Sequence, residues 1–188
     1  MPQNTPLNIN QLILVDENDN PIGEQEKIAC HLGQGQLHRA FSILLFNSQG
    51  QLLLQQRSKH KLLWPLYWSN TCCSHPAVGE SVEDACKRRL VQELNIEADV
   101  QFIYKFQYYE KYLEVGAESE LCYVMLGICD KWPTLIPEEV AAFKYVSIEQ
   151  LDTLLIEKPE DFTPWFKKEW QTLKENYWQR VEQLLDKR

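Results

Sequence analysis

Reactive side chains of complementary kinds gather in two short segments of this sequence. Residues 70–76 contain a thiol at Cys73 and an imidazole at His75, and the later run Glu118-Ser119-Glu120 adds two carboxylates. A thiol and a carboxylate can exchange protons with a bound molecule, and imidazole with carboxylate can hold a divalent ion. Together these residues predict a metal-assisted proton-transfer site.

The metal would be held by histidines and acids from separate parts of the chain. His31 and His38 lie upstream and can join His75, Glu118 and Glu120, giving three ring nitrogens and two carboxylates. Alternation along a strand places Glu118 and Glu120 on one face, so both can approach one ion. Mixed imidazole and carboxylate ligation fits zinc or manganese better than magnesium. The alternative is that His31 and His38 are ordinary exposed residues.

Composition limits the classes of protein that are possible. The chain has 188 residues, 44% of them apolar, which is enough for one hydrophobic core. Its net charge of −8 argues against binding to nucleic acid or acidic membranes. Residues 1–9 lack the basic flank and apolar stretch of a signal peptide, and the sequence contains no long apolar run. We therefore expect a cytoplasmic monomer without a membrane or nucleic-acid partner.

The cysteines other than Cys73 are interpreted as structural, reduced thiols. Cys72 and Cys73 are adjacent, where a disulfide would be strained. In an extended segment Cys72 points away from Cys73, toward the core. The remaining thiols lack metal-type spacing and are expected to be small buried residues; they are Cys30, Cys86, Cys122 and Cys129. His60, which has no candidate partner nearby in the sequence, is expected at the surface.

Short strands are expected early in the chain and helices later. The candidate strands are residues 12–15, 41–46, 52–57, 68–73, 100–109, 120–126 and 143–146. A turn-rich stretch at residues 16–21 ends the first strand, and residues 47–50 have the spacing of a hairpin loop between the second and third.

Three helices are predicted from their caps and periodicity. One covers residues 81–94, with Ser81 in a capping box and Asn95 closing it in the left-handed conformation. A short one follows Ser147, and the last starts at Thr163-Pro164 and carries apolar residues at three- and four-residue steps as far as Leu184. This order of elements is typical of an α/β layered sandwich.

Residues 74–96 resemble the Nudix box, which reads Gly, five residues, Glu, seven residues, then Arg-Glu-apolar-x-Glu-Glu-x-Gly-apolar. The matching residues are Glu80, Arg88, Glu93 and Ile96, and the departures are Ser74, Arg89, Gln92 and Asn95. Pyrophosphate hydrolysis in that superfamily depends on clustered carboxylates that hold several magnesium ions. One of three closely spaced acids is left here, which disfavours hydrolysis.

Residues 12–170 are similar to type I isopentenyl-diphosphate isomerases. The motifs that agree in order and spacing are Glu26-Lys27 before His31, Leu37-His38-Arg39-Ala40-Phe41, Trp64-Pro65, Trp68, Cys73-Ser74-His75-Pro76, Glu118-Ser119-Glu120 and Thr163-Pro164-Trp165. The resemblance implies one Nudix-type α/β/α sandwich domain with a mixed sheet. Its core is expected at about residues 36–168, with the N-terminal strand segment and C-terminal helix packed on it. It also implies interconversion of isopentenyl diphosphate and dimethylallyl diphosphate.

That reaction needs a dry pocket, because water would capture the tertiary carbocation formed when an alkene is protonated. The resemblance implies that Cys73 and Glu120 are the facing proton donor and acceptor, with the Cys73 pKa tuned by nearby cations and metal. Tyr108 would set the proton of Glu120. Trp165 would face the cation, an interaction of about 2 kcal/mol when desolvated, although its position also suits a core aromatic.

The diphosphate requires positive charge within an acidic protein. Lys27, Arg57, Lys61 and Arg89 match basic positions of the family, and Arg suits forked contacts with phosphate oxygens. Glu93 would hold magnesium shared with the diphosphate. The alternative is that Arg89 and Glu93, four residues apart on a helix, form an ordinary surface pair.

Two other functions remain open from the sequence. One is a Nudix hydrolase that cleaves a nucleoside diphosphate derivative. The other is a noncatalytic module in which a metal held by histidines only stabilises the fold. The acidic pair Glu138-Glu139 is either a solvated turn or part of a pocket entrance.

Overall fold

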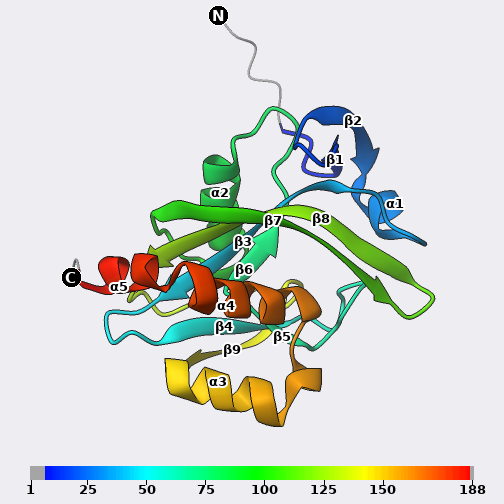
Figure 1. Ribbon diagram of the computed structural model, residues 1–188. Coiled ribbons are helices and arrows are strands. Elements are labelled where there is room, and N and C mark those ends of the chain that lie inside the picture. The colour runs from blue at the N-terminus through cyan, green and yellow to red at the C-terminus, as the bar shows by residue number, and fades with distance from the viewer. Residues whose placement is uncertain (1–6, 187–188) are drawn as a thin grey trace, which may run out of the picture.

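A mixed β-sheet forms the centre of the molecule in the computed structural model, which describes residues 7–186 (Figure 1). Strand β3 (His38–Phe46) pairs in parallel with β8 (Gly116–Ile128) and antiparallel with β6 (Cys72–Ser74). Strand β8 also pairs antiparallel with β7 (Val100–Tyr112). Because β3 and β8 run parallel in a long register, residues near the start of β3 lie next to residues near the start of β8.

The remaining strands extend the sheet around this centre. Strand β1 (Gln11–Val15) contacts the start of β3 and pairs with β2 (Pro21–Glu26). Strand β4 (Leu52–Arg57) pairs with β5 (Trp68–Ser69) and β9 (Val140–Val146), both antiparallel. Parallel and antiparallel pairs in one sheet with helices confirm the predicted α/β class.

Helices cover both faces of the sheet (Figure 1). Helix α2 (Val82–Leu94) packs on one face, where Phe41, Ile43 and Leu45 of β3 belong to its cluster. The opposite face carries α3 (Ile148–Glu157), α4 (Pro164–Asn176) and α5 (Trp178–Asp186). Successive β3 side chains thus enter opposite cores, as strand geometry requires.

The helix caps agree with the sequence in most details. The Ser81 hydroxyl accepts a hydrogen bond from the Asp84 amide, but it donates to the Asp84 carboxylate at 2.8 Å, so the predicted capping box is only half formed. Asn95 closes α2 with a φ of 53°. Ser147 and Gln150 form both bonds of a capping box at α3. Thr163 occupies the cap position of α4 without capping it, because its hydroxyl bonds instead to that of Ser69 at 2.8 Å.

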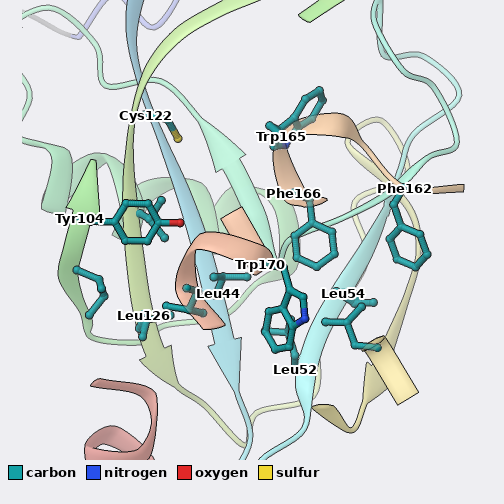
Figure 2. Packing of buried hydrophobic residues seen from close by; sticks show 14 of the residues in the cluster. Leu44, Leu52, Leu54, Tyr104, Cys122, Leu126, Phe162, Trp165, Phe166 and Trp170 are labelled. Carbon is teal, nitrogen blue, oxygen red and sulfur yellow. The ribbon is translucent and has the colours of Figure 1, made fainter. Parts of the chain in front are cut away.

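The predicted single C-terminal helix is wrong in one respect, since the chain bends between α4 and α5. Tyr177 leaves the helical conformation, with φ −131° and ψ 11°. Its ring stacks on Tyr104 of β7 with centroids 4.6 Å apart. The predicted apolar stripe does face the core, and Figure 2 shows Phe166 and Trp170 among the buried residues of this layer.

The predicted hairpin between β3 and β4 is correct only at its loop. Gly50, with a φ of 75°, closes the loop, but the two strands then share a single pair, Phe46 with Leu52. The alternation of side chains indicates which residues are buried, yet it does not specify the neighbouring strand. Here β6 and β8 take the places beside β3.

The strand expected over residues 68–73 is interrupted at Asn70 and Thr71. The Thr71 hydroxyl donates to the Leu53 carbonyl at 2.6 Å and accepts from the Leu45 amide at 2.9 Å. The Asn70 side chain donates to the Cys72 carbonyl at 2.7 Å. These side chains replace ladder bonds, so β5 and β6 lie as separate short strands around a buried polar turn.

Two short elements before β3 were not predicted, and the second contributes to the site. Strand β2 is mostly exposed and polar, and helix α1 (Lys27–His31) spans five residues, too few for a periodic pattern. The Glu26 carboxylate caps α1 by accepting from the Ala29 amide at 2.9 Å. The helix places Lys27 and His31 one turn apart.

The cysteines mostly follow the prediction. All six are free thiols, and the four that are buried are Cys30, Cys72, Cys86 and Cys122. Cys129 is only partly buried, contrary to expectation, because it lies just beyond the end of β8. His60 is exposed as expected.

The absence of a signal peptide was inferred from residues 1–9, of which residues 1–6 lie outside the described part of the chain. Within residues 7–186, no helix has the length and apolar character needed to cross a bilayer.

A carboxyl group lies inside the α4 layer of the core. Glu169 is fully buried and accepts a hydrogen bond from the Ser42 hydroxyl at 2.6 Å. Burial raises the pKa of Glu169 to about 8, assisted by the charge of Glu120 and opposed by the Ser42 hydrogen bond. The side chain is therefore protonated near neutral pH.

Replacing Glu169 by glutamine should make stability less dependent on pH. Folded Glu169 keeps a proton that the unfolded chain releases near the ordinary glutamate pKa of 4.5, so wild-type stability falls as pH rises from there to about 8. Between these pH values the variant should lose roughly 1–3 kcal/mol less free energy of unfolding than wild type. Urea unfolding at about pH 5 and about pH 8 measures it, with Glu175→Gln on the exposed side of α4 as control. An equal loss in Glu169→Gln and wild type would contradict the assignment.

Candidate active site

Three histidines and a glutamate from four elements meet at one end of the sheet. His31 ends α1, His38 begins β3, and His75 follows β6. Glu120 of β8 is the register partner of His38. The ligand atoms of these four side chains lie within 4.8 Å of one another. The group contains four of the five side chains that the sequence analysis proposed as ligands around one ion, and Glu118 is the fifth.

The buried positions of the rings exclude the alternative that they are ordinary surface histidines. His31 is 7% exposed and His38 is completely buried. The Glu120 Oε1 atom lies 3.0 Å from His75 Nε2 and 3.5 Å from His38 Nε2. Glu118, on the same face of β8, lies outside this group of four, with its Oε2 3.1 Å from His31 Nε2.

Backbone carbonyls orient two of the rings. His31 Nδ1 is 2.6 Å from the Lys27 carbonyl oxygen, and His38 Nδ1 is 2.7 Å from that of Gln36. A carbonyl oxygen can only accept, so each Nδ1 carries hydrogen and each Nε2 faces the cluster. Ligating histidines are commonly fixed in this way.

The cluster has the properties of a site for a divalent cation. Among the described residues, the buried atoms His38 Nε2 and Glu118 Oε2 make no hydrogen bond, although each lies close to another atom of the site, Glu120 Oε1 and His31 Nε2 respectively. Buried polar atoms without partners are costly, and a cation between them would remove that cost. The residues present therefore fit a divalent metal ion.

Cys30 is a neighbour of the cluster that sequence reasoning missed. Its sulfur lies 3.3 Å from His38 Nδ1. Burial opposes charge on His38, but contacts with Cys30 and Glu120 outweigh it and raise the His38 pKa to about 10. A metal ion would compete with that proton for Nε2. The available signal was the position of Cys30 directly before His31 in the sequence.

A pocket of about 130 Å³ opens beside the histidines. That volume is of the order of an apolar protein cavity that holds benzene, so a five-carbon chain fits. Its walls include nearly all the residues singled out from the sequence. They are Lys27, His31, Arg57, Lys61, Cys73, His75, Arg89, Tyr108, Glu118, Glu120 and Trp165. His38 and Glu93 do not line the pocket, and they are 0% and 1% exposed.

Cys73 and Glu120 have opposite protonation states in this pocket. Burial raises the pKa of the Cys73 thiol to about 12, although Arg57, 3.8 Å from the sulfur, opposes the rise. Burial acts on Glu120 in the same direction, but contacts with His38 and Tyr108 outweigh it and lower its pKa. The arrangement combines a neutral thiol with an ionised carboxylate, which can respectively give and take a proton. Burial therefore has a larger effect on the pKa of the thiol than the nearby cations, contrary to the expectation that cations set this pKa.

The two aromatic residues have well-defined neighbours. The Tyr108 hydroxyl donates to Glu120 Oε2 at 2.5 Å, and burial raises the Tyr108 pKa well above its usual value. It therefore remains a donor. Trp165 is 2% exposed, lines the pocket and has the Arg57 guanidinium 5.1 Å from its ring centroid. Trp165 is thus both a buried core residue and part of the pocket wall.

The four predicted cationic residues converge on the same pocket. Burial lowers the pKa of Lys27, and the nearby charges of Lys61 and Arg89 lower it further. Arg89 Nη2 lies 2.5 Å from Glu93 Oε1, and these residues are 8% and 1% exposed. The alternative of an ordinary surface pair is therefore wrong. Concentrated positive charge in a pocket that is also walled by Leu62, Leu63 and Trp165 favours a ligand with an anionic head and a short apolar tail.

Comparison with known proteins identifies the class. Residues 36–166 match the NUDIX domain family. A crystal structure of a Deinococcus radiodurans protein superposes with a TM-score of 0.65 at 24% identity, covering 79% of this chain and 90% of the other. A MutT protein from Methanosarcina mazei gives 0.58 at 16% identity, covering 78% and 94%. This is a Nudix-domain protein, as the degenerate box indicated.

Curated relatives identify the family within this class. Isopentenyl-diphosphate Delta-isomerase 1 of Photorhabdus laumondii is 45% identical over 172 residues, covering 90% of this chain and 98% of the relative. The isopentenyl-diphosphate Delta-isomerase of Pectobacterium atrosepticum is 39% identical over 171 residues, covering 91% and 94%. The chain belongs to the isopentenyl-diphosphate Delta-isomerase family, which confirms the resemblance found in the sequence.

Proposed function

We propose that this protein interconverts isopentenyl diphosphate and dimethylallyl diphosphate. The observation that carries the proposal is the pairing of a neutral thiol, Cys73, with an ionised carboxylate, Glu120, in one pocket. The names of the curated relatives support the same reaction. A Nudix hydrolase is less favoured, because Arg89 and Gln92 replace two acids of the box.

The reaction moves one double bond by adding one proton and removing another. Cys73 donates its proton to the terminal alkene carbon, which leaves a thiolate and a tertiary carbocation. Glu120 then removes a proton from the carbon next to the one that bears the diphosphate oxygen, and the new double bond forms. The reverse direction uses the same two groups with their roles exchanged. After a forward turnover, Glu120 releases its proton and the Cys73 thiolate takes one up by exchange with solvent, which restores the starting pair.

Aromatic residues protect and stabilise the cationic stage. The face of Trp165 would lie near the developing charge, an interaction of about 2 kcal/mol in a desolvated site. Tyr108 holds the Glu120 carboxylate through its hydrogen bond, which leaves Oε1 for the cluster of histidines. The low exposure of both aromatic residues limits access of water to the cation.

His31, His38, His75 and Glu120, with Glu118 as a further ligand, would hold a divalent ion, and we propose zinc or manganese. When bound, such an ion supplies positive charge that favours the ionised form of Glu120. Lys27, Arg57, Lys61 and Arg89 would bind the diphosphate. Glu93 would hold a magnesium ion shared with the diphosphate.

Incubation of reduced, metal-loaded protein with isopentenyl diphosphate in heavy water tests the proposal. Dimethylallyl diphosphate should form, and deuterium should enter both isomers because protonation is reversible. Chelation should lower the rate at least about 100-fold, and added manganese or zinc should restore it. Absence of both product and exchange would reject the isomerase. Phosphate release from a nucleotide panel would instead support the hydrolase.

A further inference from the structure

Glu139, whose role the sequence left open, pairs with two of the cations assigned to the diphosphate. Its Oε1 lies 3.1 Å from Arg89 Nη2, and its Oε2 accepts a hydrogen bond from Lys61 Nζ. Burial raises the Glu139 pKa, but Lys61 and Arg89 outweigh it and bring it to about 2. Glu139 is therefore ionised at neutral pH. One carboxylate thus partly neutralises the cationic wall of the pocket.

The backbone fixes Glu139 in this place. The Ser58 amide donates to the Glu139 carbonyl at 3.0 Å, and the Ser58 hydroxyl donates to the Pro137 carbonyl at 2.9 Å. The next residue, Val140, begins β9 and pairs with Arg57 of β4. The turn that carries Glu139 is therefore attached to the segment from which Arg57 and Lys61 reach the pocket.

The exposure of the three side chains would allow Glu139 to be exchanged for another anion. Arg89 is enclosed and also bound by Glu93, whereas the Glu139 side chain is 28% exposed and the Lys61 side chain 22%. Glu139 can thus move toward solvent while Arg89 keeps its partner. A diphosphate carries more charge and more acceptor oxygens than a carboxylate and binds Arg in a forked geometry. It is the stronger partner for these cations.

We propose that Glu139 is an internal counter-ion that occupies the anion subsite of the free protein and leaves Lys61 and Arg89 when a diphosphate binds. In the free protein it holds both side chains toward the pocket and limits repulsion among Lys27, Lys61 and Arg89. Its displacement reduces the net affinity for the ligand. This inference deepens the proposed function, on which it rests for the identity of the ligand.

The variant Glu139→Gln tests this inference through binding of inorganic pyrophosphate, measured by isothermal titration calorimetry. Loss of the competing charge should tighten binding about tenfold, with and without magnesium. The control is Glu138→Gln, which removes the same charge from the exposed neighbouring residue and should leave the affinity within about twofold. In a Lys61→Met background the gain from Glu139→Gln should shrink, because one of the released cations is gone.

Unchanged or weaker binding of pyrophosphate by folded Glu139→Gln would overturn the proposal. Weakening only in magnesium would assign Glu139 to the metal instead, which also overturns it. Circular dichroism and the melting temperature establish that each variant is folded. The binding result is separate from the isomerase assay. Failure to form dimethylallyl diphosphate would reject the proposed function, whereas the pyrophosphate titration judges Glu139 alone.

Discussion

Cys73→Ala should reduce the rate of isomerisation by a factor of about 10³ or more, with little change in bound metal. The thiol is the neutral, half-buried donor of the pocket, and its pKa of about 12 keeps the proton on sulfur at neutral pH. Alanine has no proton to give, and the sulfur lies outside the group of clustered metal ligands. Product formation and deuterium exchange measure the rate, and elemental analysis measures the metal.

The neighbouring thiol provides a matched control for Cys73. Cys72 is fully buried and belongs to the core cluster of α2, on the other face of the sheet. Cys72→Ala should therefore cost about 1 kcal/mol of stability and leave the isomerisation rate close to that of wild type. An active Cys73→Ala protein would remove the thiol from the mechanism.

Glu120→Gln should have the largest effect of any single substitution, about 10⁴-fold or more in rate together with loss of metal. The carboxylate is both the proposed proton acceptor and one of the four clustered ligands, and it also accepts the Tyr108 hydrogen bond. The amide is a poor base and a weak ligand. Rate and metal content should fall together, and excess metal should not restore the rate.

Glu118→Gln separates ligation from proton transfer. Glu118 lies two residues away on the same face of β8 and contacts His31, but it is outside the cluster of four. This variant should bind metal more weakly and recover most of its rate when excess metal is supplied. Equal and irreversible losses in both variants would argue that Glu120 acts only as a ligand.

The site could be predicted from the sequence better than the strand connections. Cys73, His75, Glu118 and Glu120 were singled out by residue type and given roles by resemblance to the isomerase family, and the structure brings them to one pocket. The neighbours of β3 could not be predicted, because hydrophobic alternation is the same whichever strand lies alongside. Helix α1 was missed since five residues carry no periodic signal.

Contacts between distant parts of the chain were also hidden from the sequence. At the bend between α4 and α5, Tyr177 stacks on Tyr104 of β7, a contact that no local pattern encodes. The ion pairs of Glu139 with Arg89 and Lys61 likewise join two loops and helix α2. Local propensity describes one segment at a time, whereas these features arise only when segments meet.

The parallel docking of β8 on β3 determines when a metal ion can be captured. His38 and Glu120 face each other solely through that pairing, which connects segments far apart in sequence. Pairing of segments so distant in sequence requires closure of a large loop, which is entropically costly. The four clustered side chains can therefore hold one divalent ion together only after β8 has paired with β3. In zinc-finger peptides, by contrast, the ion itself drives folding.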